Sequence, residues 1–317
     1  MSLKCNVIDV GARYGLHPSW NGLRGLMNFY LFEMDEEEAE RLQKKYEPHP
    51  NIRVYPTALY SKNCTLKYKV RKHKGLNSFL DSNVTFLKKK KYFAEESIEE
   101  SEVETEATTI DSFFEGQSIH FLKVDTEGAD LEVLQGAKQK LENTILGART
   151  EVYFVEFNSR APLFGDMHKF MISHNFDLIN LDYAGQGHHF SKFTRPGKYG
   201  QLMGTDAVWI KSPDLVLDQP EEKLIEDVVF LAIFLMHNNA TDIAMNLLLR
   251  AMTERHVSFY HLVGDPIFES LKRDISFLFK DMLLMPGIDE NEIYDVYFRL
   301  FQTKYPKWNS FYETYSL

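Results

Sequence analysis

Acidic residues recur at the ends of short apolar runs in this sequence, and the spacing of two of them suggests a site for a nucleoside. Asp9 lies in the run NVIDV, Gly11 follows it, and Glu33 lies 22 residues after that glycine. A carboxylate about 20 residues after a glycine turn is the usual ligand of ribose hydroxyls in nucleotide-binding sheets. Since such sheets bind ligands beyond the carboxyl ends of their strands, we expect these three residues at one cleft.

The loop that begins at Gly11 limits which cofactor this cleft can take. It reads GARYG, with alanine and arginine in place of the second glycine that lets a dinucleotide fingerprint approach a pyrophosphate. A P-loop is excluded, because no G-x-x-x-x-G-K-[ST] occurs. A cofactor without phosphate suits the loop better, and S-adenosylmethionine (SAM) is one. Glu33 would meet its ribose, and backbone N–H groups or Arg13 would meet its carboxylate.

Strands that alternate with helices must position these residues. The expected strands are 6–10, 28–35, 51–61, 65–72, 118–128, 151–158, 176–183 and 205–212. The expected helices are 35–47, 129–143 and 162–174, and Asp35 is the expected N-cap of the first. This alternation predicts an α/β fold with a largely parallel sheet.

The pattern changes at two places along the chain. Between 81 and 106 the periodicity is lost, and four lysines (Lys88 to Lys91) are followed by an acidic run. We expect a charged, solvated insertion there or a flap over the site. After Pro213 the pattern is helical to the end of the sequence. The prediction is therefore a SAM-binding domain over 1–213 and a C-terminal all-α domain over 214–317.

Composition and charge narrow the possible partners. The net charge of −10 disfavours a general nucleic-acid binder, which needs a basic face to displace counterions. The longest apolar run, 228–236, is about half of what a bilayer span requires. Two cysteines and the lack of a signal-peptide pattern favour a cytoplasmic protein. The prediction is no nucleic acid, no membrane span, and a homo-oligomer as one use of the helical domain.

Three quoted stretches resemble a known family. VIDVGARYG, FLKVDTEGADLEVLQGA and VYFVEFN are similar to the FkbM-type SAM-dependent methyltransferases, and the resemblance covers about residues 6–212. The chain departs from the family pattern at three places: Met34 replaces proline, Arg13 and Tyr14 replace asparagine and an aliphatic residue, and Asp130 replaces glutamate. The resemblance implies a Rossmann-like class I methyltransferase sheet of seven strands, mostly parallel, with the last strand antiparallel.

The resemblance also implies a set of site residues. Those carried over as cofactor ligands are Asp9, Gly11, Ala12, Arg13, Glu33, Met34, Ala58 and Leu59. Ala58 and Leu59 would flank the adenine, and the acid that often meets its amine is missing. Asp125 and Glu127 would lie near the methyl group and the acceptor, with Glu156 at the next strand end. Acceptors in the family include sugar and secondary-metabolite hydroxyls, which predicts O-methylation of a small molecule or glycan precursor.

A hydroxyl acceptor needs a base, and several residues are candidates. Asp125 is the preferred base, with Glu127 and His17 as alternatives. Asp125 and Glu127 could instead cap the helix that follows them, and His17 could be an ordinary loop histidine. No metal site is expected, because the pair His188–His189 lacks a third ligand with suitable spacing.

Two other functions compete with a methyltransferase. An NAD-type oxidoreductase would use a related sheet, but the missing glycine counts against it. A non-catalytic SAM-binding protein could use the helical domain to bind a partner. Methylation of a nucleobase amine is disfavoured, because the segment VDTEG takes the place of the [DN]-P-P-[YF] element that holds such amines.

Overall fold

The computed structural model describes residues 3–90, 93–182, 188–189 and 200–274. The chain divides into two units, one of Lys4–Leu215 and the other of Met1–Leu3 with Val216–Leu317. Residues 275–317, which make up much of the expected helical domain, lie outside the described residues.

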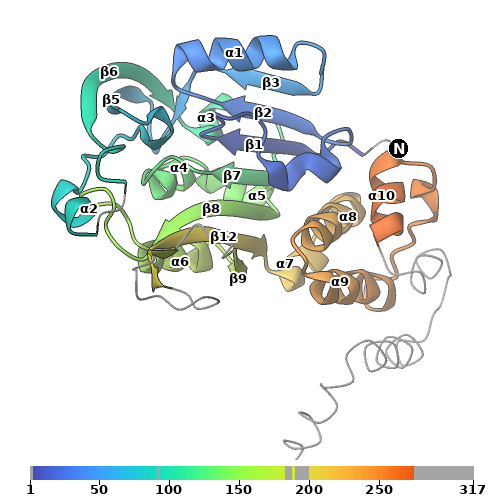
Figure 1. The fold of residues 1–317 in the computed structure, drawn as a ribbon. Coiled ribbons are helices and arrows are strands. Elements are labelled where there is room, and N and C mark those ends of the chain that lie inside the picture. The colour runs from blue at the N-terminus through green and yellow to red at the C-terminus, as the bar shows by residue number, and fades with distance from the viewer. Residues whose placement is uncertain (1–2, 91–92, 183–187, 190–199, 275–317) are drawn as a thin grey trace, which may run out of the picture. The chain divides into compact units, whose positions relative to one another are not determined.

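A seven-stranded sheet runs through the larger unit in the order β3-β2-β1-β7-β8-β12-β9 (Figure 1). Its strands are β1 (Asn6–Val10), β2 (Asn28–Phe32), β3 (Ile52–Tyr55), β7 (Phe121–Val124), β8 (Gly147–Tyr153), β9 (Phe176–Asp182) and β12 (Gly204–Lys211). The last strand, β12, is antiparallel to both of its neighbours, whereas the pairs from β3 through β8 are parallel. The mostly parallel, seven-stranded class I sheet is therefore confirmed.

One strand begins and ends earlier than its composition indicates. The run 151–158 is rich in aromatic and β-branched residues, but β8 ends at Tyr153. Pairing decides its position: Gly147 lies opposite Phe121 of β7 on one side and opposite Ile210 of β12 on the other. Neighbouring strands thus override local propensity. As a consequence Glu151, and not Glu156, is the acid that this strand carries near its carboxyl end.

The helices follow the sequence pattern closely, with one break. In α1 (Glu36–Tyr46) the Asp35 side chain accepts the Glu38 N–H, which confirms the expected N-cap. The expected helix 129–143 is instead α4 (Asp130–Gln135) and α5 (Lys138–Asn143). It breaks at Gly136, where a Cβ would lie 2.0 Å from the Tyr60 carbonyl oxygen. That backbone contact fixes the chain direction at the break.

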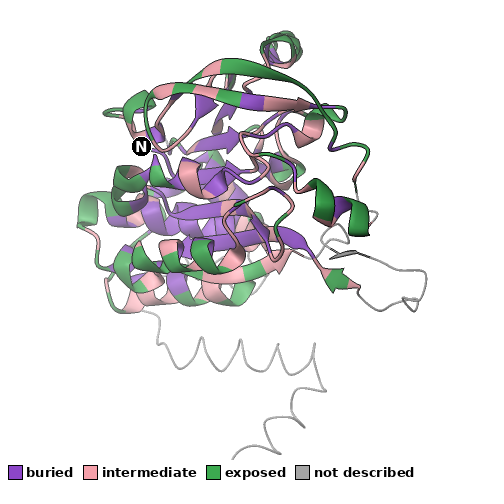
Figure 2. Cartoon of the chain, turned by 90° about the vertical axis from the view of Figure 1, so that its left-hand side faces the viewer, coloured by how far each residue is buried: buried purple, intermediate pink, exposed green. Residues whose placement is uncertain are grey.

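The core of this unit lies on one face of the sheet. Residues of β1, β2, β7, β8 and β12 pack there against α3 (Ile110–Phe113), α4, α5 and α6 (Phe164–Ser173). On the other face Trp20, from the 3-10 helix η1 (Pro18–Leu23), packs against Phe29 and Phe121. Figure 2 shows the central strands buried between exposed helix surfaces. Burial on both faces makes the sheet a rigid frame for the loops at its edge.

A second, three-stranded sheet contains residues for which the sequence pattern predicted a different structure. It consists of β4 (Ala58–Leu59), β5 (Cys64–Arg71) and β6 (Glu99–Thr108), with η2 (Lys74–Leu76) and α2 (Val84–Lys90) between β5 and β6. The expected strand 51–61 is thus split, because β4 belongs to this sheet. The aperiodic segment 81–106 contains α2 and most of β6. Its pattern is lost because β6 is largely exposed and its glutamates pair with lysines of β5, as Glu102 does with Lys67 and Lys69.

The remaining elements include the helical unit. α7 (Pro213–Leu217) spans the division, and α8 (Glu221–His237), α9 (Thr241–Thr253), η3 (Tyr260–Leu262) and α10 (Pro266–Asp274) follow it. A short ladder, β10 (His188–His189) with β11 (Gln201–Leu202), lies before β12. The apolar run of α8 is buried, as a core helix requires. Within the described part of the chain, no helix has the length and apolar character to cross a membrane.

Gly11 offers a test of how the loops after β1 and β7 meet. Its φ is +76°, and a Cβ would lie 1.8 Å from the Asp125 carbonyl oxygen. Gly116 has a similar φ of +72° with nothing within 4 Å of such a Cβ. Gly116→Ala should therefore lower the free energy of unfolding by about 1–2 kcal/mol, the cost of the left-handed backbone alone. Gly11→Ala should cost at least about 3 kcal/mol, because the clash is added.

Urea unfolding followed by circular dichroism measures both values. Equal losses in the two variants would show that the two loops do not touch as described.

Candidate functional site

A pocket with about 550 Å³ of empty space lies where β1, β2 and β7 end. Eight of the twelve residues that the sequence assigns to the site line it: Gly11, Arg13, Glu33, Met34, Ala58, Leu59, Asp125 and Glu127. They come from three strand ends of the large sheet and from β4 of the small one. Both sheets therefore contribute residues to the lining of one pocket within the larger unit.

Glu33 forms the polar end of this pocket next to β2. Its side chain is almost fully buried, and its Oε1 accepts the Asp35 N–H at 2.8 Å. Burial raises the pKa of Glu33, while the hydrogen bond from Asp35 opposes that rise. The backbone thus fixes one carboxylate oxygen and leaves the other for a ligand, which is the arrangement that ribose recognition needs.

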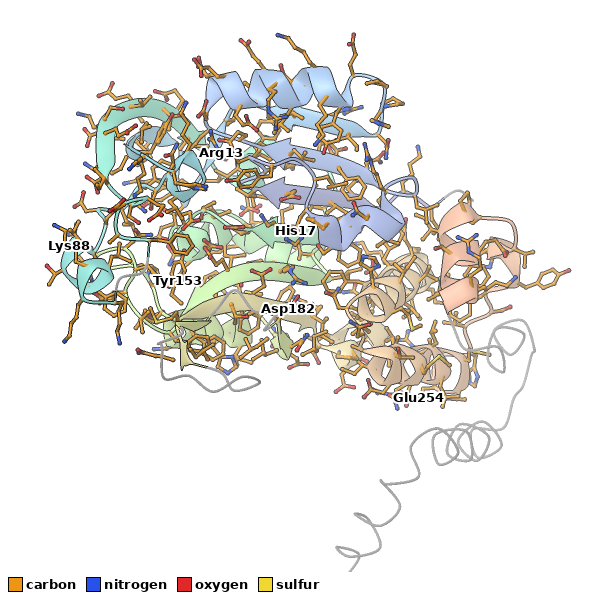
Figure 3. All side chains as sticks on the ribbon, viewed as in Figure 1. Arg13, His17, Lys88, Tyr153, Asp182 and Glu254 are labelled. Carbon is orange, nitrogen blue, oxygen red and sulfur yellow. The ribbon has the colours of Figure 1, made fainter. Side chains whose placement is uncertain are left out.

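Arg13 lines the pocket but is already engaged. Its guanidinium forms an ion pair with Asp35 at 3.1 Å, and both side chains are mostly buried (Figure 3 labels Arg13). The pairing contributes to a lowered pKa of Asp35 despite partial burial. Arg13 therefore holds a carboxylate of the protein itself, and Lys74 is a second cation at the pocket wall.

The loop after Gly11 uses most of its N–H groups internally. The N–H groups of Gly11 and Ala12 donate to the Phe32 carbonyl, and that of Gly15 donates to the Ala12 carbonyl. Leu16 N–H donates to the Tyr46 hydroxyl, and His17 N–H to Asp9 Oδ2. Five N–H groups of residues 11–17 are thereby satisfied within the protein. Few remain to surround an anionic group such as a pyrophosphate.

Asp9, His17 and Ala12 support the pocket from outside its lining. Asp9 is completely buried, and its Oδ2 anchors the His17 backbone. The His17 ring lies 2.8 Å from the Ser19 hydroxyl, where it caps η1, and burial lowers its pKa. Ala12 is buried beneath the loop. The His17 ring is not among the side chains that line the pocket, and its expected role as a base stays a prediction.

A buried lysine connects Asp9 with the acids after β7. The Lys123 Nζ lies 3.5 Å from Asp9 Oδ1 and 3.2 Å from Asp125 Oδ2. Burial opposes the charged form of Lys123, but the two carboxylates outweigh it and raise its pKa. Burial likewise raises the pKa of Asp9, and Lys123 counteracts this. The sequence held a signal for this group, because a lysine within the otherwise apolar strand FLKV requires a carboxylate partner.

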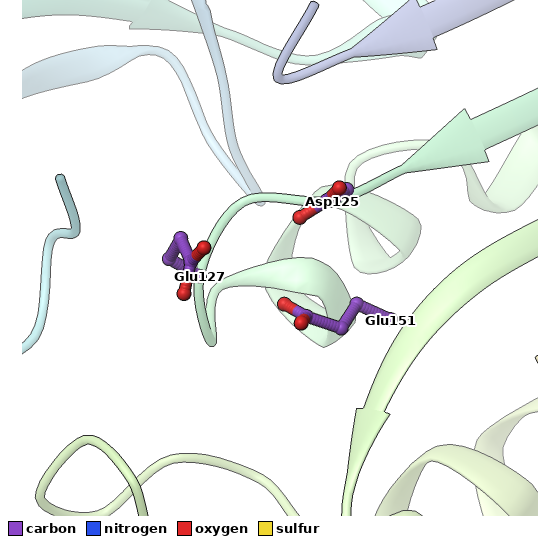
Figure 4. Close-up of side chains that lie close together, drawn as sticks. All are labelled: Asp125, Glu127 and Glu151. Carbon is purple, nitrogen blue, oxygen red and sulfur yellow. The ribbon is translucent and has the colours of Figure 1, made fainter. Parts of the chain in front are cut away.

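Three carboxylates, one of them that of Asp125, lie close together. Asp125 and Glu127 lie on the loop after β7 and Glu151 lies on β8, with one oxygen of each within 4.8 Å of the others (Figure 4). The Tyr153 hydroxyl lies 2.6 Å from Glu151 Oε2 and 3.1 Å from Glu127 Oε2. A phenol has a single proton to donate, so both contacts are hydrogen bonds only if one of the glutamates is protonated.

The electrostatics of this acidic group agree with that geometry. Burial, followed by repulsion from Asp125, raises the pKa of Glu127 to about 8. The same causes raise the pKa of Asp130 to about 7, whereas burial, followed by repulsion from Glu127, raises that of Glu151 well above its ordinary value. Carboxylates at this spacing could hold a divalent cation or share protons. The raised pKa values favour shared protons, and Asp125 differs from these acids in its ion pair with Lys123.

A polar network fixes the loop that carries Glu127. The Glu127 backbone has a φ of +55°, which is uncommon for a residue other than glycine. Its carbonyl accepts hydrogen bonds from the Ser78 hydroxyl and the Asn158 amide, each at 2.7 Å. Arg71 in turn donates to Asn158 Oδ1 at 2.8 Å. Arg71 of the small sheet and Ser78 thereby help to hold the loop that follows β7 in place.

Several site residues were beyond the reach of the sequence. Glu151 and Tyr153 depend on the register of β8, and Thr57, Lys74 and Phe79 line the pocket through the small sheet. In contrast, Glu156 was expected and is exposed, with only its carbonyl bonded to Asn83. The side chains of His188 and His189 lie outside the described residues.

A family comparison decides the broader identity. The model described as the methyltransferase FkbM domain matches residues 9–178, which is more than half of the chain. This chain belongs to the FkbM methyltransferase family. The family match includes every residue that lines the pocket described above. No curated protein sequence gives a significant match.

Solved structures of methyltransferases are similar in fold. The FkbM methyltransferase from Methylobacillus flagellatus KT is 16% identical, with a TM-score of 0.39, and the match covers 66% of this chain and 43% of that one. The 23S rRNA methyltransferase ErmE is 12% identical, with a TM-score of 0.33 and coverage of 86% and 77%. A dimethyladenosine transferase from Plasmodium falciparum is 11% identical, with a TM-score of 0.31 and coverage of 97% and 92%. This FkbM family chain thus spans less than half of the first of these structures.

Glu127 should make stability depend on pH in a defined direction. Its pKa is about 8 in the folded protein and near 4.5 when unfolded, so its contribution falls as pH rises between those values. Glu127→Gln removes this loss. Relative to the wild type, the variant should gain about 1–3 kcal/mol between about pH 5 and about pH 8.

Urea unfolding at the two pH values measures the gain, with exposed Glu115→Gln as the control for loss of one charge. If the difference in free energy of unfolding between Glu127→Gln and the wild type did not grow with pH, the raised pKa of Glu127 would be contradicted. Stabilisation of the wild type by Mg²⁺ would show that a cation, instead of protons, neutralises the three carboxylates.

Proposed function

We propose that this chain is a SAM-dependent methyltransferase that methylates a hydroxyl group of a small polar acceptor, such as a sugar, a glycan precursor or a secondary metabolite. The observation that carries the proposal is the pocket itself. It joins a fixed, buried glutamate after β2 to a proton-accepting aspartate after β7. Family membership supports methyl transfer, and SAM is the methyl donor that such families generally use.

The residues of the pocket fit SAM by their chemistry. SAM presents ribose hydroxyls, an apolar adenine face, a positively charged sulfonium and a zwitterionic amino-acid end. Glu33 would hold the ribose hydroxyls, and Ala58 with Leu59 would contact the adenine. The Asp125 carboxylate suits positive charge, while Lys74 suits the carboxylate of SAM. Acidic and basic residues thus lie in the same pocket, as a zwitterionic cation requires.

When bound, SAM supplies a methyl group on a charged sulfur, and the sulfur keeps the bonding electrons as the methyl group passes to the acceptor. The protein must align the acceptor oxygen and remove its proton. Asp125 is the residue proposed to take that proton, because it reaches the pocket and Lys123 stabilises its negative charge. Glu127 and Glu151 already share protons with Tyr153, so they are poorly placed to accept another near neutral pH.

We also propose that the acceptor is a small molecule and that the protein is cytoplasmic. A net charge of −10 and acidic pocket walls oppose a polyanion such as RNA near Asp125 and Glu127. The hydroxyl preference rests on the family resemblance. An NAD-type oxidoreductase is disfavoured because most N–H groups of the loop that begins at Gly11 form hydrogen bonds within the protein, so few remain for a pyrophosphate. A non-catalytic SAM-binding protein is the second alternative, and only turnover separates it from an enzyme.

Calorimetry and product analysis test the function directly. Titration should give heat with SAM and with S-adenosylhomocysteine, and none with NAD. Methyl-labelled SAM should transfer label to a compound in a small-molecule extract or glycan-precursor pool, and mass spectrometry should identify a methyl ether. Label in total RNA would identify a nucleic-acid acceptor instead. SAM binding without transfer to any pool would favour the non-catalytic alternative, and NAD binding without SAM binding would exclude methyl transfer.

Glu33 offers a test of the cofactor assignment alone. Glu33→Ala should weaken SAM binding by about 1–3 kcal/mol, because a charge-assisted hydrogen bond to the ribose is lost. Glu40→Ala, on the exposed face of α1, is the matched control and should leave the affinity unchanged. Isothermal titration measures both. An unchanged affinity in Glu33→Ala would remove Glu33 from the cofactor site.

A further inference from the structure

We propose that the Asn77 side-chain amide binds the acceptor oxygen and makes the site selective for hydroxyl over amine acceptors. This inference rests on the proposed function and adds a residue and a selectivity to it. Asn77 lies just after η2, outside the strand-end acids, and it lines the same pocket as Asp125 and Glu127.

The Asn77 amide is buried with an unused donor. The residue is 7% exposed, and its Oδ1 accepts the Arg71 N–H at 2.9 Å. That bond fixes which end of the amide is oxygen, so the Nδ2 end faces elsewhere. Nδ2 has no hydrogen-bond partner within the described part of the chain. A buried amide donor without a partner is costly in a folded protein, and a ligand that accepts its hydrogen bond removes that cost.

The surrounding contacts hold this amide beside the acidic loop. The neighbouring Ser78 forms an antiparallel bridge with Lys69 of β5, and its hydroxyl donates to the Glu127 carbonyl at 2.7 Å. On the other side, Arg71 links through Asn158 to the same carbonyl. Asn77 therefore sits in a framework anchored at both ends to the loop of Asp125 and Glu127. Asn77 and these two acids line the same pocket.

A hydroxyl acceptor can form hydrogen bonds with both Asp125 and Asn77 while it attacks, whereas an amine acceptor cannot. A hydroxyl oxygen has one proton and two lone pairs. It can donate its proton to Asp125, accept a hydrogen bond from Asn77 Nδ2, and still attack with its second lone pair. A neutral amine has a single lone pair, which it needs for the attack. Its N–H groups would face the N–H groups of Asn77 and leave that donor unsatisfied.

This selectivity parallels a general feature of polar sites. A site built to hydrogen-bond a particular group rejects analogues that leave its buried polar atoms unpaired. Asp125 alone could take a proton from either kind of acceptor. The donor opposite it is what distinguishes oxygen from nitrogen, and the orientation of the Asn77 amide supplies that donor.

Asn77→Asp is the first variant, because an aspartate keeps the oxygen that accepts the Arg71 N–H, while it loses the donor and adds a carboxylate. With the acceptor that the wild type methylates, kcat/KM should fall about 10- to 100-fold, while SAM affinity stays within about twofold. Asn63→Asp is the matched control. Its Oδ1 also accepts a backbone N–H, from Thr109, but Asn63 is exposed and does not line the pocket. This control should keep wild-type kcat/KM.

Asn77→Ala removes the donor without adding charge, and it should show a similar loss if Asn77→Asp does not fold. Mass spectrometry of the labelled product should find a methyl ether and no N-methyl group. Wild-type kcat/KM in a folded Asn77 variant, or an N-methylated product, would overturn this inference and leave the methyltransferase intact. If the wild type binds no SAM or transfers no methyl group, the proposed function itself fails.

Discussion

The buried Lys123 ammonium is the interaction on which the rest of the site depends. It lies between Asp9 on one side and Asp125 on the other, and neither the lysine nor Asp9 has access to solvent that could replace the pairing. Removing a buried charge of this kind leaves its partners uncompensated. Asp9 in turn anchors the loop after β1 through the His17 N–H. One cation thus connects the strand that shapes the cofactor side with the strand that carries the acids.

The acids beyond Asp125 exceed the available positive charge, and their arrangement separates two roles. Glu127, Glu151 and the Tyr153 hydroxyl share protons in a confined space, so they act as a neutral polar wall near neutral pH. Asp125 has an ion-pair partner of its own, Lys123, and lines the pocket. Neighbouring carboxylates with different surroundings can therefore serve different functions. Proton acceptance is assigned to Asp125 for this reason.

The sequence predicts best those site residues that lie directly at the ends of strands with clear patterns. Glu33 and Asp125 end apolar runs, and both line the pocket. Glu151 could not be predicted, because pairing with β7 and β12 shifts β8 toward Gly147. Most of the wall from the small sheet was also hidden, with Ala58 and Leu59 of β4 as the exceptions. Its strand β6 is exposed and held by charge pairs across to β5, so it has no apolar alternation to reveal it.

The loop GARYG pointed to the correct fold, but the motif does not by itself explain why Gly11 is required. Gly11 is required because the Asp125 carbonyl occupies the space of a Cβ, whatever cofactor binds. The second glycine of a dinucleotide loop would serve to admit a pyrophosphate, but here Tyr46, Asp9 and the carbonyls of Phe32 and Ala12 take the N–H groups. Arg13, at that position, forms an ion pair with Asp35. The loop is thus built to be filled by its own side chains, and a cofactor without phosphate is what such a loop leaves room for.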